Sequence, residues 1–221
     1  MARPGNSQSD FHSGTERPRA VFFDLGGVLL DWDPRNLYRK LFGDDTEAME
    51  IFLTEVCSPA WHLQQDKGMS VAAACAGLKV QFPLHTELIE AWELRSDEMI
   101  SGVIEGSAEM LAELKAAGVP CYALSNMERE TWGRRLGIYP FLHWFDGYFI
   151  SALEGVLKPD PRYFELALER FGLEPREVFF IDDREENVAS ARSLGIMAAQ
   201  FSGAQAVRAG LSACGLLPSG P

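Results

Sequence analysis

The chain has 221 residues, of which 47% are hydrophobic and 24% are charged. This composition is ordinary for a soluble globular protein and allows one domain, or a core with a small insertion. Its 32 acidic and 20 basic residues leave a net charge of −12. Because nucleic acids and anionic membranes are bound mainly through Lys and Arg, this charge argues against both as partners.

The first 18 residues are polar and lack the apolar stretch of a signal peptide, so we expect a disordered tail over residues 1–18. No apolar run approaches the length that a bilayer requires. The cysteines lie far apart and have no zinc-binding spacing, so we expect them to be reduced, which indicates the cytoplasm. They are Cys57, Cys75, Cys121 and Cys214.

Short apolar runs followed by Gly, Ser, Asn or Asp predict strands that are buried on both faces of a parallel sheet. They cover residues 20–24, 120–124, 148–150 and 177–181, with a weaker candidate at 197–201. Helical patterns at 108–117, 161–171 and 185–194 lie between these runs, and a glycine follows each of them. This alternation predicts a doubly wound α/β fold.

The segment from residue 35 to residue 101 shows no strand-like run and is rich in Leu, Ala, Met, Glu and Trp at helical spacing. We interpret it as a helical insertion, with the α/β core formed by residues 19–34 and 102–221. The stretch from Trp61 to Lys67, which includes His62, Gln65 and Asp66, has hydrogen-bonding groups that would suit a polyol. A helix with one buried face explains the same pattern, so we assign none of these residues to the site.

Polar residues follow three of the predicted strands: Asp24, Ser125 and the pair Asp182-Asp183. The carboxyl ends of parallel strands meet at one crevice. A carboxylate there can act as a nucleophile toward a phosphoryl group, provided that Mg²⁺ and a lysine offset the negative charge. Lys158 is the candidate lysine, although each of these residues also has a purely structural interpretation, such as helix capping.

Four motifs in this order strengthen the functional interpretation. They are Phe-Asp-Leu-Gly-Gly-Val-Leu-Leu-Asp at 23–31, Leu-Ser-Asn at 124–126, Leu-Lys-Pro-Asp-Pro at 157–161 and Phe-Ile-Asp-Asp at 180–183. In these motifs the chain resembles the haloacid dehalogenase superfamily of hydrolases, in the branch with a helical cap inserted after the first motif. The resemblance extends from residue 20 to about residue 201.

The resemblance implies a Rossmann-like, doubly wound parallel sheet with an inserted α-helical cap at 35–101. It also implies a Mg²⁺-dependent phosphatase that hydrolyses a small phosphate monoester through a phospho-aspartate intermediate. Carried over by position, Asp24 is the nucleophile and a Mg²⁺ ligand, and Lys158 neutralises developing charge. Ser125 and Asn126 bind the phosphoryl group, and the metal is also bound by Asp183, Asp182 and the backbone carbonyl of Gly26.

Gly26 is a departure from the family pattern, because many of its phosphatases have an aspartate there that acts as general acid and base. Such catalysis typically contributes a factor of about 10² to 10⁴ in rate. Asp31, Asp33 and His62 are candidate replacements. A branch that includes α-D-glucose-1-phosphate phosphatase has a similar first motif, and this chain resembles it most. A sugar phosphate is therefore the default substrate class.

Two alternatives remain open. A 2-haloacid dehalogenase would use the same nucleophile, but the dehalogenases of this family need no Mg²⁺ and usually carry Ser and Asn around the fourth motif. Asp182-Asp183 therefore favours the phosphatase. The other alternative is a weakly active phosphate-binding module that keeps the pocket and turns over poorly because of Gly26. The expected partner is a small phosphorylated metabolite, and the chain is either a monomer or a homodimer.

Overall fold

The computed structural model describes residues 17–218. The disordered tail predicted for residues 1–18 therefore lies outside the described part, except for Arg17 and Pro18. Among the described helices, none is long and apolar enough to cross a membrane.

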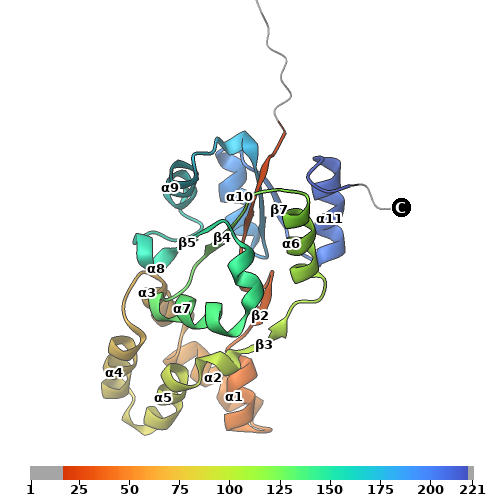
Figure 1. The fold of residues 1–221 in the computed structure, drawn as a ribbon. Helices are drawn as coiled ribbons and strands as arrows, with labels where there is room; N and C mark the ends of the chain where they lie inside the picture. The colour runs from red at the N-terminus through yellow and green to blue at the C-terminus, as the bar shows by residue number, and fades with distance from the viewer. Residues whose placement is uncertain (1–16, 219–221) are drawn as a thin grey trace, which may run out of the picture.

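A five-stranded parallel sheet lies at the centre of the core, with the strand order β5-β4-β1-β6-β7 (Figure 1). Its strands are β1 (Ala20–Phe23), β4 (Cys121–Ser125), β5 (Gly147–Ile150), β6 (Val178–Asp182) and β7 (Met197–Gln200). Each of the five predicted runs overlaps one of these strands, with bounds that agree to within one residue, and every residue of β1 and β6 is buried. The α/β fold class predicted from the sequence is confirmed.

Successive strand residues point to opposite faces of the sheet, and helices cover both faces. Val21 and Phe23 of β1 belong to one apolar cluster, together with residues of α6 (Ser107–Ala116), α7 (Arg129–Ile138) and α11 (Ala204–Ala213). Ala20 and Phe22 belong to a second cluster, with residues of α9 (Pro161–Phe171) and α10 (Glu185–Ser193). The short helix α8 (Ser151–Glu154) follows β5 directly.

The sequence of α9 shows why these helices form where they do. The side chain of Asp160 caps the helix by accepting a hydrogen bond from the Arg162 backbone N–H, and Pro161 occupies the first helical position. Tyr163, Phe164, Ala167 and Leu168 recur at helical spacing and are buried in the second cluster. The helix ends at Gly172, which has a φ of +64°.

The segment between β2 (Leu30–Trp32) and β3 (Ile100–Val103) is helical, and we call its helices α1–α5 the cap. Their bounds are α1 (Arg35–Phe42), α2 (Thr46–Ile51), α3 (Pro59–Asp66), α4 (Val71–Gln81) and α5 (Thr86–Leu94). They pack around an apolar cluster of their own that includes Tyr38, Phe52 and Trp92. Figure 1 shows α1, α2, α4 and α5 together at one end of the molecule.

The strands β2 and β3 form an antiparallel pair at the two ends of the cap segment, with Leu30 opposite Val103 and Trp32 opposite Ile100. The sequence did not predict this pair, and β3 begins inside the segment that was expected to hold helices alone. The two strands are short, carry several exposed positions and lie at opposite ends of the insertion. A local sequence pattern therefore holds little signal for their pairing.

Candidate active site

A cavity of about 490 Å³ lies between the carboxyl ends of the central strands and the cap. Most of the residues predicted for the site from the sequence line it, namely Asp24, Gly26, Ser125, Asn126, Lys158 and Asp183. Asp182, the remaining predicted residue, is fully buried and bonded to Lys158 behind the cavity wall. The fold therefore brings all seven residues together, as expected for polar groups at the ends of parallel strands.

Asp24 follows β1 and is 7% exposed. Its backbone N–H donates to the carbonyl oxygen of Ile181, which fixes the residue beside the end of β6. Oδ1 accepts a hydrogen bond of 2.7 Å from the backbone N–H of Leu25 and lies 3.0 Å from Nζ of Lys158. Burial raises the pKa of Asp24 well above its usual value, with Lys158 acting in the opposite direction.

Lys158 is held rigidly between carboxylates and backbone. Its Nζ donates to Oδ2 of Asp182 at 2.7 Å and to the Leu124 carbonyl oxygen at 3.0 Å. Burial by itself lowers the pKa of Lys158, but Asp182 and Asp24 outweigh it and raise the pKa. Asn126 fixes the backbone, because its side chain accepts from the N–H of Lys158 and donates to the carbonyl, each at 2.9 Å. The lysine is therefore a positioned, permanently charged cation.

The two aspartates of the fourth motif have different surroundings. Oδ1 of Asp182 accepts hydrogen bonds from the Arg184 backbone N–H and from Nδ2 of Asn187, while its Oδ2 accepts from Lys158. Asp183 instead lines the cavity, and burial raises its pKa. Gly27 provides the space for Asp183: its φ is +71°, and a Cβ there would collide with the Asp183 carboxylate.

These carboxylates are suited to a divalent cation. One oxygen from each of Asp24, Asp182 and Asp183 lies within 4.8 Å of the others. Carboxylate and carbonyl oxygens are the ligands that Mg²⁺ prefers. Three carboxylates beside the single ammonium of Lys158 also leave an excess of negative charge in a largely buried site. The residues present therefore fit the Mg²⁺ that the sequence predicted.

Ser125 ends β4, is 3% exposed and lines the cavity. Its Oγ lies 3.5 Å from the Asn126 carbonyl oxygen, which is too far for a strong hydrogen bond. The hydroxyl can therefore turn toward an anion in the cavity.

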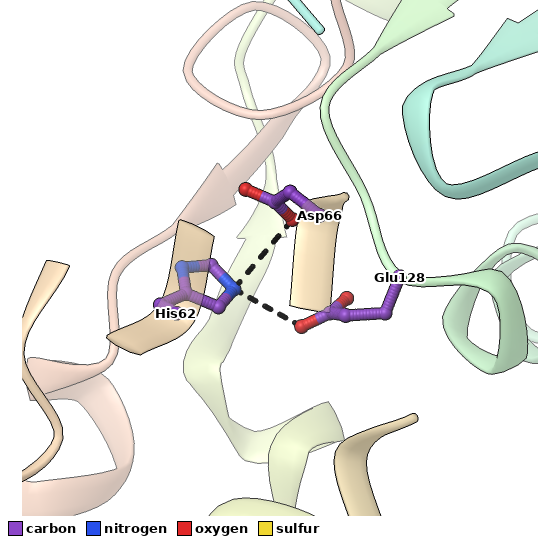
Figure 2. A group of neighbouring side chains, drawn as sticks. All are labelled: His62, Asp66 and Glu128. Carbon is purple, nitrogen blue, oxygen red and sulfur yellow. Dashed lines mark hydrogen bonds and ion pairs between the residues drawn. The ribbon is translucent and has the colours of Figure 1, made fainter. Parts of the chain in front are cut away.

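Three ionisable residues form a cluster on the cap side of the same cavity, which we call the cap cluster. His62 and Asp66 lie one turn apart on α3, and Glu128 precedes α7. Nε2 of His62 is 3.0 Å from Oε1 of Glu128 and 3.8 Å from Oδ1 of Asp66, and Figure 2 shows it directed toward both carboxylates. The sequence interpretation left His62 and Asp66 out of the site and did not consider Glu128.

The cluster shifts the pKa of each member. Burial alone would lower the pKa of His62, but Glu128 and Asp66 raise it above its usual value. Burial would raise the pKa of Glu128, but its hydrogen bond with His62 lowers it to about 2. Burial raises the pKa of Asp66 to about 6, although His62 opposes the shift. With a pKa of about 6, Asp66 can hold or release a proton more easily than an ordinary aspartate.

The other two candidate replacements for an acid at Gly26 do not line the cavity. Asp31 is exposed and accepts a hydrogen bond from Ser101. Asp33 accepts from the backbone N–H of Arg35 at the start of α1. Of the three residues proposed from the sequence, His62 alone faces the cavity.

A sequence profile of haloacid dehalogenase-like hydrolases matches residues 18–195. Among curated proteins, the chain is 29% identical over 185 residues to sesquiterpene phosphatase astK of Aspergillus oryzae, covering 81% of this chain and 87% of that protein. It is also 29% identical over 191 residues to (S)-2-haloacid dehalogenase 4A of Burkholderia cepacia, covering 80% of each. Some other relatives are much longer, and the chain spans 18% and 34% of two of them.

Among solved structures, a HAD family enzyme from Bacteroides thetaiotaomicron in complex with magnesium and inorganic phosphate is similar to this chain, with a TM-score of 0.65. The two sequences are 24% identical, and the match covers 84% of this chain and 95% of the other. At this identity the likeness concerns the fold.

Proposed function

Because the chain belongs to the haloacid dehalogenase-like hydrolase family, and is therefore a hydrolase, we propose that it is a Mg²⁺-dependent phosphatase that forms a phospho-aspartate on Asp24. The observation that carries this proposal is the pairing of two features in one cavity. The Asp24 carboxylate lies 3.0 Å from a buried lysine, and the acidic group that includes Asp183 lies beside it. The expected substrate is a small phosphate monoester.

Each residue has a role in this proposal. An oxygen of Asp24 attacks phosphorus, and the ammonium of Lys158 offsets the charge that the phosphoryl group brings beside the carboxylates. The hydroxyl of Ser125 and its neighbour Asn126 contact the phosphoryl oxygens. Asp24, Asp183 and the backbone carbonyl of Gly26 would hold Mg²⁺, which neutralises phosphoryl charge when bound.

The surroundings of Asp182 refine the predicted ligand set. Both of its oxygens already accept hydrogen bonds, from Lys158 on one side and from Arg184 and Asn187 on the other. We therefore assign Asp182 to positioning Lys158, while a direct contact with the metal stays a prediction. Asn126 has a similar second role, because its side chain fixes the backbone of Lys158.

The 2-haloacid dehalogenase reaction is the second candidate, since the relatives include such an enzyme. Ester formation on Asp24 with loss of halide needs no metal. The placement of Asp183 in the cavity, where it adds to the negative charge around Asp24, favours a site that takes up a cation. A phosphatase among the relatives supports the same choice.

The substrate, the cellular location and the oligomeric state stay predictions. Sugar phosphate is the default class because of the first motif, and the helices of the cap would contact the part of the substrate that does not react. A cytoplasmic location and a monomeric or homodimeric state are likewise expectations from the sequence.

The test is hydrolysis of an aryl phosphate with Mg²⁺ and with a chelator, for the wild type, Asp24→Asn and Asp44→Asn. Asp44 is an exposed cap residue, so its variant controls for the same chemical change away from the site. We expect activity that requires Mg²⁺, disappears in Asp24→Asn and survives in Asp44→Asn. Metal-independent release of chloride from 2-chloropropionate, without phosphatase activity, would overturn the proposal in favour of the dehalogenase.

A further inference from the structure

Phosphate monoester hydrolysis through Asp24 requires two proton transfers in opposite directions. The leaving alkoxide is basic and must be protonated as its bond to phosphorus breaks, and the water that cleaves the phospho-aspartate must lose a proton. Gly26 has no side chain to serve either step. Lys158 is committed to two carboxylates that keep it charged. The proton must therefore come from another part of the cavity wall.

Asp66 is a cap residue that is fixed against the strand ends of the core. It is 7% exposed and lines the same cavity as Asp24. The hydroxyl of Ser151, the residue directly after β5, donates to the Asp66 carbonyl oxygen at 2.7 Å. The same hydroxyl accepts from the backbone N–H of Met127 at 3.1 Å. This end of α3 is therefore attached to the loop that follows β4.

One carboxylate oxygen of Asp66 lacks a hydrogen bond. Its Oδ1 is buried, and in the described structure it makes no hydrogen bond. A buried oxygen without a hydrogen bond typically destabilises a protein by about 1–3 kcal/mol, and the ion pair with His62 at 3.8 Å is too long to supply that bond, so a functional explanation is needed. The charged groups that act on Asp66 are His62, Glu128, Arg184 and Lys158. The last of these belongs to the catalytic centre itself.

His62 is held in place and has a different task. Its ring stacks on Trp32 at 5.3 Å between centroids and meets Trp92 edge-on at 5.2 Å. Glu128 binds its Nε2 at 3.0 Å, so that atom is directed toward Asp66 and Glu128 together (Figure 2). A ring fixed in this way can tune the charge on Asp66, whereas its own Nε2 proton is engaged by Glu128.

We propose that Asp66 is the general acid and base of this hydrolase, supplied by the cap, and that His62 and Glu128 are its positioning residues. The inference rests on the proposed phosphatase function and deepens it. In the first half-reaction, Asp24 forms a bond to phosphorus, the bond from phosphorus to the leaving oxygen breaks, and protonated Asp66 gives its proton to that oxygen. The products are a phospho-aspartate, an alcohol and the Asp66 carboxylate.

In the second half-reaction, the Asp66 carboxylate removes a proton from water as the water oxygen attacks phosphorus. The bond between phosphorus and Asp24 breaks, inorganic phosphate leaves, and Asp66 is protonated again. One monoester and one water are thus converted to one alcohol and one phosphate. The carboxyl of Asp66 returns to its starting state in each turnover.

The test compares Asp66→Asn with the wild type and Asp44→Asn on two substrates, an aryl phosphate with a good leaving group and an alkyl phosphate with a poor one. With the aryl phosphate, Asp66→Asn should release one equivalent of phenol per site and accumulate the phosphoenzyme, visible by intact mass. Steady-state turnover should then fall by about 10² to 10⁴. With the alkyl phosphate the variant should form little phosphoenzyme, because the first step also needs the acid.

Wild-type activity on both substrates in Asp66→Asn would overturn the proposal. So would an equal loss on both without accumulation of phosphoenzyme, because this pattern indicates a structural role. If the wild type itself forms no phosphoenzyme on Asp24, the proposed phosphatase function fails first. The two failures are therefore distinguishable.

A second variant tests the role of His62 as a positioning residue. Because the charge on His62 lowers the pKa of Asp66, His62→Gln should move the acid–base limb of the alkyl phosphatase pH profile to higher pH. A profile with an unchanged midpoint and a reduced amplitude would show that His62 has a packing role alone.

Discussion

Asp66→Asn should stabilise the folded protein at alkaline pH while it damages catalysis. Burial raises the pKa of Asp66 from 3.8 to about 6, so the folded protein binds this proton more tightly than the unfolded chain does. Each pKa unit corresponds to about 1.4 kcal/mol, and the shift of about two units gives about 3 kcal/mol. Ionised Asp66 thus destabilises the native state by up to about this amount.

The pH range over which Asp66 destabilises the folded protein follows from the upward direction of its pKa shift. Above about pH 6 the folded protein carries the full destabilisation, and as the pH falls toward about 4 the folded state gains stability by holding the proton. Asparagine cannot ionise. The variant should therefore be more stable than the wild type by up to about 3 kcal/mol near pH 8, and the difference should shrink toward zero near pH 4.

Urea denaturation of the wild type, Asp66→Asn and Asp44→Asn across this range measures the difference directly. Acid effects on other carboxylates are common to all three proteins, so they cancel when the variants are compared. A difference that does not change with pH, or a variant that is less stable than the wild type near pH 8, would refute the reasoning. A variant that gains stability and loses turnover would show that the buried carboxylate is kept for function.

Two further changes test the catalytic centre. Gly27→Ala should destabilise the protein by about 1–3 kcal/mol and weaken Mg²⁺ binding, because residue 27 has a φ of +71° and the new Cβ would collide with the Asp183 carboxylate. Calorimetric titration with Mg²⁺ measures the affinity, and an unchanged affinity would contradict the prediction. Lys158→Met should lower stability by about 3–5 kcal/mol near pH 8, because it leaves Asp24 and Asp182 buried without their cation. That loss should diminish in acid, as urea denaturation at two pH values would show, since protonated carboxyls need no counter-ion.

The core of the fold was predictable because each strand carries its own signal. Residues 20–23 form a continuous apolar run, which is typical of a strand buried between two covered faces, and the structure buries all of β1. The helix predicted at 161–171 has a cap at Asp160, a proline at its start and a glycine after its end, and α9 has these bounds. By contrast, β2 and β3 form because Leu30 pairs with Val103, and a local sequence pattern does not predict a pairing between residues so far apart in the chain.

The position of the candidate active site was predictable for a related reason. Asp24, Ser125 and Asp183 each follow a strand that the sequence identifies, and topology alone then brings them together. No comparable rule predicts the cap cluster of His62, Asp66 and Glu128. His62 and Asp66 have the spacing of neighbours on a helix, but Glu128 is distant in sequence and joins them only when the cap folds over the loop after β4. The burial that shifts the pKa of Asp66 is likewise invisible in the sequence.

The carboxylates on the core side and those on the cap side of the cavity both repel an anionic substrate. A phosphate monoester is an anion, and it must enter a cavity whose walls carry Asp24 and Asp183 on one side and Asp66 and Glu128 on the other. On the core side Lys158 and a bound divalent cation would offset the repulsion. On the cap side His62 offsets one carboxylate, and Asp66 can be neutralised by a proton because its pKa is already about 6. The anion raises that pKa further, so we expect substrate binding to take up a proton, and the proton taken up is the one that the leaving group needs.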